Sequence, residues 1–400
     1  MAVIQLMRIL FSVIISSVIL VATLQAEPLD APVVEMGKSG VSNFIARMEK
    51  ERKAHVAFLG GSITQNEKGH CKMVADWLTE NWSDVDFTFT NAGLSSTCSL
   101  TGAGRVDRDV LSKGQVDLLV LEFAVNDDQD AGHDRKTAIR GLEGIVRQYY
   151  RENPSGNIIS VQYVNPGILE NIQKGEETVS VAAHKAVAHH YGLPIVDVGQ
   201  GLANEIAAGK MTWKENYAGT HPNPEGYQFA SDLITSVIEK TISGETPQTV
   251  TLPDPLDELS YGNMQVVDPQ VINWLGGWKH ALVSKELLPM GQIRGDYEKF
   301  KAIRSDSAGD HLYCSFAGRT LGAFVLAGPD AGALEVSIDN GEWKKVELYH
   351  SYSGGLNYPR TVILADDLNN AYHQVAIRTA ASENEKSKGA TATVLYFVTN

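Results

Sequence analysis

Residues 55–64 read HVAFLGGSIT, an apolar run that leads directly into two glycines and a serine. The run predicts a buried strand, and the glycines let the backbone turn sharply where the strand ends. That turn leaves the hydroxyl of Ser62 at the carboxyl edge of a sheet, where a nucleophile is exposed to its substrate. Taken alone, the segment is more typical of a Gly-Ser turn that caps a helix, so its meaning depends on the segments around it.

Short apolar runs and helical patterns alternate through residues 55–240, which predicts an α/β domain. Strands separated by helices imply right-handed crossovers and a parallel sheet covered on both faces. In such a sheet the chemistry gathers at the carboxyl ends of the strands. The expected strands are residues 55–59, 85–90, 116–123, 158–163 and 194–198, and the expected helices are residues 72–81, 138–150, 179–191 and 224–241.

The pattern changes near residue 245, where a linker is marked by Pro247, Pro253 and Pro255. Beyond it, short β-type runs are separated by turns rich in glycine and asparagine. We therefore expect a smaller all-β domain at residues 246–400, a sandwich of jelly-roll type. Its expected strands include residues 324–326, 334–338, 361–364 and 375–377.

Composition excludes several classes of function. The chain has 400 residues, of which 43% are hydrophobic and 20% charged, so it is expected to fold into globular domains. A formal charge of −14 leaves no basic footprint for nucleic acid or for anionic lipid. The three cysteines never occur as CxxC, which argues against a disulfide scaffold and against the common zinc motifs.

The start of the chain predicts a secretory signal peptide over residues 1–26. Arg8 is the only charge before Glu27, and residues 9–22 are almost wholly apolar. An uncleaved membrane anchor is the alternative, although the apolar run is slightly short for a span. The mature chain, with its α/β domain at residues 27–245, is then expected to be secreted or periplasmic, without stable membrane insertion.

Three further loops at the same sheet edge carry polar side chains. Residues 91–97 follow the second strand, residues 122–127 follow the third, and residues 219–223 precede the last helix. The amide of Asn126 can donate to an oxyanion, and His221 can act as general base for Ser62. Each loop alone is more typical of a turn or a cap. Their common edge and their order predict a serine hydrolase site.

Together these segments resemble the signature blocks of the SGNH/GDSL hydrolase superfamily over roughly residues 52–242. The resemblance implies a flavodoxin-like, three-layer α/β/α domain with Ser62 as nucleophile and His221 as base. It also implies an oxyanion hole formed by the Ser62 N–H, the Asn126 amide and a backbone N–H of the second block, and it implies no metal or organic cofactor. The matching blocks are Gly60-Gly61-Ser62 (with Gly61 where the family commonly has Asp), Asn91 to Thr97, Val125-Asn126-Asp127 and His221-Pro222-Asn223.

Two positions depart from the family pattern. Ser96 stands where the second block usually has its oxyanion glycine, and its backbone N–H can serve unless the site needs a positive φ. Ala218 stands where the family has the Asp that orients the histidine. We expect a Ser-His dyad whose imidazole is held by a neutral acceptor such as a main-chain carbonyl near Tyr217. A weak or inactive enzyme, or a carboxylate from another loop, is the alternative; the candidate acids are Asp127, Asp128, Asp130 and Glu215.

The predicted function is a secreted serine esterase that removes acetyl or another small acyl group from a carbohydrate. The ester chemistry follows from the site, and the carbohydrate from secretion, the appended sandwich and the habit of the family. Two alternatives stay open: a lipid or thioester acylhydrolase, and a non-catalytic glycan-binding protein.

Four smaller expectations concern other side chains. We expect Cys71 and Cys98 to form a disulfide, with Cys314 left as a buried thiol. The loop of Asp127, Asp128, Asp130 and Asp134 lacks the spacing of a calcium site and is expected to be solvated, as are His184, His189 and His190. Aromatic residues of the second domain are expected mainly in its core, with a sugar-stacking platform as the alternative; they are Trp274, Trp278, Trp343, Tyr349, Tyr352 and Tyr358.

Overall fold

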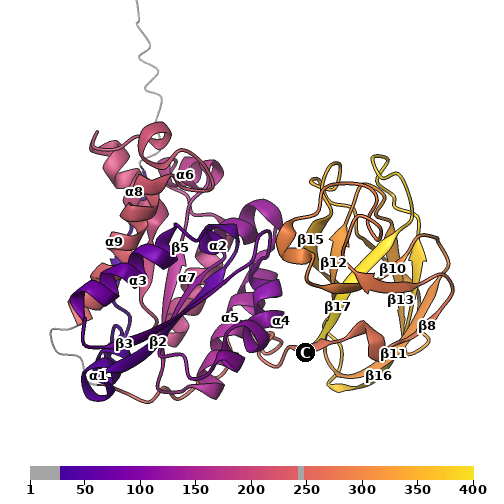
Figure 1. Cartoon of the computed structure of the whole chain (residues 1–400), viewed down its shortest axis with the longest axis horizontal. Coiled ribbons are helices and arrows are strands. Elements are labelled where there is room, and N and C mark those ends of the chain that lie inside the picture. Colours follow the sequence, from indigo (N-terminus) through magenta and orange to yellow (C-terminus); the bar gives the residue numbers. More distant parts are fainter. Residues whose placement is uncertain (1–27, 242–246) are drawn as a thin grey trace, which may run out of the picture.

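The computed structural model describes residues 28–241 and 247–400 (Figure 1). The predicted signal peptide lies outside the described residues, and the expected domain boundary between residues 245 and 246 falls within the undescribed segment 242–246. Within the described ranges, no helix combines the length and hydrophobicity that crossing a bilayer requires.

The first domain contains the expected α/β sheet, whose strand order is β1-β6-β5-β4-β2-β3. Strands β2 to β6 are parallel, and β1 adds an antiparallel edge that was not predicted. The fold class is therefore confirmed. The strands are β1 (Val34–Glu35), β2 (Lys53–Gly60), β3 (Asp86–Gly93), β4 (Leu118–Glu122), β5 (Asn157–Gln162) and β6 (Ile195–Asp197).

Helices cover both faces of this sheet, which explains why its central strands are apolar without alternation. In β2, Ala57 and Leu59 face one core, while Val56 and Phe58 face the other. The helices α4 (Ser99–Asp109), α5 (Arg135–Glu152) and α7 (Val179–Tyr191) pack mainly on the first face. The second face is covered by α1 (Ser42–Glu51), α3 (His70–Asn81), α6 (Pro166–Gln173), α8 (Val198–Ala207) and α9 (Pro224–Thr241).

Helix α4 was not predicted because two glycines interrupt its apolar pattern. A Cβ on Gly102 would lie 2.6 Å from Phe123, and one on Gly104 would lie 3.0 Å from Val398 of the second domain. The helix thus has glycine where neighbouring side chains come close to its backbone. This close packing requires glycine even though glycine lowers the intrinsic helix propensity.

The second domain is the expected sandwich of two antiparallel sheets. One sheet has the order β15-β12-β17-β10-β9, with β7 also paired to β17, and the other has the order β14-β13-β16-β11-β8. The strands are β7 (Gln265–Val267), β8 (Asn273–Leu275), β9 (Lys279–Leu282), β10 (Lys301–Ser305), β11 (His311–Gly318), β12 (Leu321–Ala327), β13 (Ala333–Ile338), β14 (Lys344–Glu347), β15 (Tyr358–Ala365), β16 (Ala371–Ala380) and β17 (Ala392–Thr399).

The two domains share a hydrophobic core. On β12, Ala323 and Val325 face the interior of the sandwich, whereas Phe324 and Leu326 join the core of the α/β domain. The sheet that contains β12 and β17 lies beside α4 and α5 (Figure 1). Around this apolar contact, the buried Arg140 forms ion pairs with Asp366 at 2.8 Å and Asp367 at 2.7 Å.

The predicted disulfide is wrong, because all three cysteines are free thiols. Cys71 belongs to the core on one face of the α/β sheet and Cys98 to the core on the other face. Neighbouring loops at one sheet edge can thus send their side chains to opposite sides of the sheet. Cys314, expected to be buried, is partly exposed.

Phe324→Ala tests the shared core. Phe324 is fully buried, with ring centroids 5.0 Å from Tyr396 and 6.1 Å from Tyr297. Its removal leaves a cavity between the domains, so we expect the free energy of unfolding to fall by about 3–5 kcal/mol in urea titrations. The control Leu275→Ala, exposed on β8, should stay within about 0.5 kcal/mol of wild type. Equal losses in both variants would contradict a core-like contact.

Candidate active site

Ser62 begins the short helix α2 (Ser62–Gln65) directly after β2. Its two preceding glycines are required by close packing rather than by an unusual φ. A Cβ on Gly61 would lie 2.1 Å from Asn126 Oδ1, and a Cβ on Gly60 would lie 2.3 Å from Glu122 Oε1. The side chain of Asn126 therefore occupies the space that a side chain at residue 61 would need.

Ser62 and His221 are in direct contact, as the sequence led us to expect. The Nε2 atom of His221 lies 2.7 Å from the Ser62 Oγ. Burial and the charge of Arg294 lower the pKa of His221 below its ordinary value of 6.5, while Asp130 opposes this shift. The ring is therefore mostly neutral near pH 7, as a general base must be.

No carboxylate orients the His221 ring. Within residues 28–241 and 247–400, Nδ1 of His221 has no hydrogen-bond partner. Asp127 Oδ2 instead accepts from Ser99, Asp128 accepts from Asn165, and Asp130 accepts from Asn126. The Ser-His dyad therefore stays a prediction, with none of these carboxylates hydrogen-bonded to the ring. The expected main-chain acceptor for Nδ1 is not found either.

The other predicted site residues line the same cavity as the Ser-His pair. Asn126 is buried and donates one amide N–H to Asp130 at 2.7 Å, which leaves its second N–H free for a substrate oxygen. Ser96 has a φ of +62°, in the left-handed region that favours glycine. Glycine, which the family usually has at this position, adopts this conformation without steric strain. For serine the same conformation costs about 1–2 kcal/mol.

Two buried charged residues beneath the site were missed. Glu122 Oε1 accepts hydrogen bonds from the N–H groups of Gly61 at 3.0 Å and Thr64 at 3.3 Å, on either side of Ser62. Arg105 donates to the carbonyl of Gly60 at 2.8 Å and to that of Ala92 at 2.6 Å. The first and second signature loops are thereby tied together from below. For Glu122, the sequence offered one signal of a buried functional role, namely a glutamate at the end of an apolar strand.

Two expectations about solvated side chains are wrong. Asp127 is fully buried and His184 is 1% exposed, and they pair at 2.9 Å. Burial disfavours the Asp127 carboxylate, but His133 and His184 outweigh that effect and hold its pKa below the ordinary range. His189 is exposed, as predicted, and His190 is partly exposed.

The cavity above Ser62 measures about 500 Å³ and is built by both domains. The second domain contributes Gln292, Arg294, Tyr352 and Tyr358 to its wall. Of the six aromatic residues singled out in the sequence, Tyr352 and Tyr358 therefore reach the site. Trp278 and Tyr349 are buried, and Trp343 lies under the guanidinium of Arg378 at 4.4 Å.

The model of the GDSL-like lipase/acylhydrolase family matches residues 58–229. That range contains Ser62, Ser96, Asn126 and His221, the residues that the structure gathers around one cavity. Residues 58–229 are therefore similar to this family, which confirms the resemblance found in the sequence. The chain is an enzyme that acts on ester bonds, which confirms that prediction.

The two-domain fold of the chain is also found in solved structures. Two crystal structures of a two-domain esterase (CEX) active on acetylated mannans, one co-crystallized with mannopentaose, match with a TM-score of 0.72. They are 21% identical and cover 91% of this chain and 95% and 96% of their own. LAE5, an alpha/beta hydrolase from the metagenome of Lake Arreo, Spain, is 16% identical with a TM-score of 0.41 and covers 46% of this chain and 95% of its own. A comparison with curated proteins finds no match.

Glu122→Gln tests the support below Ser62. Burial raises the pKa of Glu122 from 4.5 to about 7, although hydrogen bonds from Thr64 and Gly61 oppose this shift. The folded state therefore keeps a proton that the unfolded chain loses, so Glu122 costs stability as pH rises from 4.5 to about 7. Glutamine accepts the same bonds without titrating. We expect the wild type to lose unfolding free energy relative to Glu122→Gln across this window, and no further above it.

Urea unfolding at several pH values measures that difference. The control Glu239→Gln, exposed on α9, should track the wild type at every pH. A difference between wild type and Glu122→Gln that does not change with pH would contradict a buried, titrating glutamate.

Proposed function

We propose that this GDSL-like hydrolase removes acetyl or similarly small acyl groups from a carbohydrate through a Ser62–His221 dyad. The observation that carries the proposal is the Ser62 Oγ–His221 Nε2 contact of 2.7 Å beside a cavity with a polar, aromatic outer wall. Such a wall suits a sugar, whose ring faces stack on aromatic side chains and whose hydroxyls bond to polar ones.

The shape and lining of the cavity argue against a long acyl chain. Its apolar side chains are few, and Gln292, Arg294 and Asp130 would face a lipid tail without satisfying partners. A lipid acylhydrolase needs a continuous apolar cleft, so a small acyl group is the better fit. A purely binding protein would have no need to hold Ser62 and His221 in hydrogen-bond contact.

The fold of the two-domain esterase active on acetylated mannans gives independent support. That protein is also a two-domain esterase, and the match extends over 91% of this chain and 95% of its own. The predicted signal peptide adds that the enzyme acts outside the cytoplasm, where it would meet extracellular glycans. Acetylated polysaccharides are thus the proposed substrate class.

The reaction follows from the positions of the side chains. Ser62 Oγ attacks the acetyl carbonyl while its proton passes to His221 Nε2. The oxyanion accepts hydrogen bonds from the N–H groups of Ser62 and Ser96 and from the Asn126 amide. The sugar oxygen leaves with the proton from His221. Water, deprotonated by the same nitrogen, then releases acetate and restores Ser62.

Substitutions of the reacting groups test this assignment. Ser62→Ala should abolish release of acetate, and Asn126→Ala should lower kcat by about 10²- to 10³-fold through loss of one oxyanion donor. Ser112→Ala is the control, because the exposed hydroxyl of Ser112 donates to the carbonyl of Arg108 and does not line the cavity. Acetate is measured from acetylated oligosaccharides by mass spectrometry. Wild-type rates in Ser62→Ala would overturn the dyad.

Tyr352→Ala tests the carbohydrate part of the proposal. Tyr352 is 43% exposed at the cavity wall, so it can stack on a sugar without supporting the fold. We expect kcat/KM on acetylated oligosaccharides to fall about tenfold, or about 1.4 kcal/mol, with little change on ethyl acetate. Tyr313→Ala, similarly exposed at 40% on β11, should change neither rate. Equal loss on both substrates would place Tyr352 in the fold rather than in sugar binding.

A further inference from the structure

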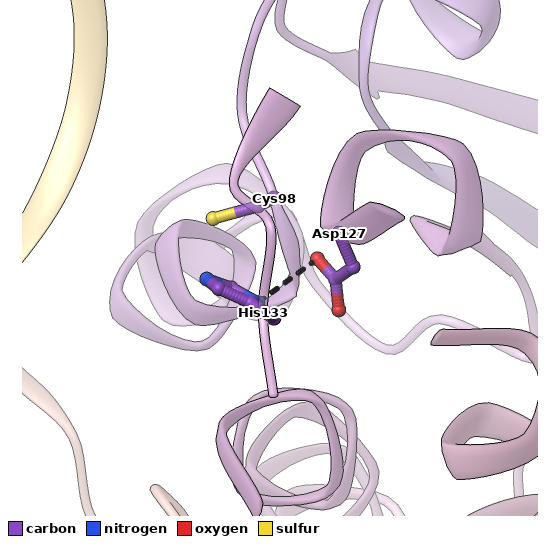
Figure 2. A group of neighbouring side chains, drawn as sticks. All are labelled: Cys98, Asp127 and His133. Carbon is purple, nitrogen blue, oxygen red and sulfur yellow. Dashed lines mark ion pairs between the residues drawn. The ribbon is translucent and has the colours of Figure 1, made fainter. Parts of the chain in front are cut away.

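Cys98, Asp127 and His133 form a cluster beside the active-site cavity that the proposed reaction does not use (Figure 2). One donor atom from each residue lies within 4.8 Å of the other two. Cys98 comes two residues after Ser96, and Asp127 directly follows Asn126. The cluster therefore joins the two loops that carry the outer oxyanion donors.

The geometry of His133 is unusual for a structural ion pair. Its side chain is only 9% exposed, and its Nδ1 atom is buried without a hydrogen-bond partner. Nδ1 faces Asp127 Oδ1 at 3.4 Å, which is longer than the usual N–H···O range of about 2.7–3.2 Å. A buried ring nitrogen in this position calls for a partner.

The same distance suits two ligands of one metal ion. Zinc binds histidine nitrogen and carboxylate oxygen at about 2.0–2.2 Å in tetrahedral geometry, so two such ligands lie about 3.3–3.5 Å apart. The Nδ1–Oδ1 separation of 3.4 Å falls within this range. A thiolate, an imidazole and a carboxylate also form a donor set that selects zinc over calcium or magnesium.

The Asp127 carboxylate is held as a metal ligand would be. Ser99 donates its N–H to Oδ1 at 2.8 Å and its hydroxyl to Oδ2 at 2.6 Å, and His184 lies 2.9 Å from Oδ2. Partners of this kind orient a ligating carboxylate in known sites. One lone pair of Oδ1 is left to face His133 and Cys98.

A second cavity of about 270 Å³ adjoins the cluster and gives access to it. Cys98 and His133 line this cavity together with Arg360 of the second domain. We propose that Cys98, Asp127 and His133 bind one zinc ion, with a water from this cavity as the fourth ligand. The ion would clamp the loops of Ser96 and Asn126 and would take no part in the ester chemistry.

A proton on His133 is the competitor of zinc. Zinc binding would displace this proton and the proton of the Cys98 thiol. Affinity for zinc should therefore increase with pH.

Cobalt provides the direct test, because a thiolate bound to Co²⁺ gives a charge-transfer band in the near ultraviolet. The purified chain is freed of metal with a chelator and titrated with Co²⁺ at pH 8. We expect one equivalent to bind with this band, and Zn²⁺ to displace it. Cys98→Ser should lose the band, whereas the control Cys314→Ser should keep it.

Two further measurements cover variants that fold poorly. In the wild type, Zn²⁺ should raise the Tm and should protect Cys98, but not Cys314, from alkylation. His133→Gln should weaken zinc binding by more than the about 10- to 100-fold that loss of an outer partner costs. Absence of the cobalt band in the wild type, or its persistence in Cys98→Ser, overturns the proposal. An unchanged wild-type Tm with Zn²⁺ overturns it as well.

Discussion

The packing of one sandwich sheet against α4 and α5 is the contact on which the rest of the site depends. Because β12 sends Phe324 and Leu326 into the core of the α/β domain, the second domain is held over the catalytic edge. From there it reaches the signature loops directly. Tyr297 donates to the carbonyl of Ser95 at 2.9 Å, and His350 Nε2 lies 2.9 Å from the carbonyl of Asp130. The appended domain thus both supports the oxyanion loops and supplies the outer wall of the cavity.

Two buried polar side chains hold the backbone of the signature loops in place. An apolar core cannot do this, because it offers no hydrogen-bond partners to main-chain groups. Arg105 is 1% exposed and donates hydrogen bonds to main-chain carbonyls of two loops. Glu122 accepts hydrogen bonds from main-chain N–H groups on either side of Ser62. Each group satisfies polar atoms that the sharp turns leave without partners. The proposed oxyanion hole requires fixed N–H directions. Glu122 holds the N–H groups of Gly61 and Thr64, and Arg105 holds the carbonyls of Gly60 and Ala92.

The sequence was most informative where a residue type has one common structural role. Uninterrupted apolar runs identified the parallel strands, and the glycines before Ser62 identified the turn. It was least informative where the environment decides. Nothing local distinguishes the buried Asp127 from its exposed neighbour Asp134, because only Ser99, His133 and His184 make burial tolerable. Likewise, the sequence placed Cys71 and Cys98 in neighbouring loops at one edge of the sheet. It did not show that their side chains point to opposite faces of the sheet, because tertiary packing decides that direction.

The missing carboxylate at Ala218 has a physical counterpart in the loop that carries His221. Ala218 has a φ of +77°, a conformation that costs alanine about 1–2 kcal/mol, so the loop must be closed by other contacts. Asn223 supplies them, since its N–H donates to the carbonyl of Tyr217 at 2.9 Å and its side-chain amide to the carbonyl of Glu215 at 2.7 Å. The backbone before His221 is thus held without an acid. Burial and Arg294 lower the pKa of His221, whereas Asp130 and the water that reaches this ring oppose that shift. In the proposed dyad, Asp130 and solvent would therefore favour the imidazolium without an acid hydrogen-bonded to the ring.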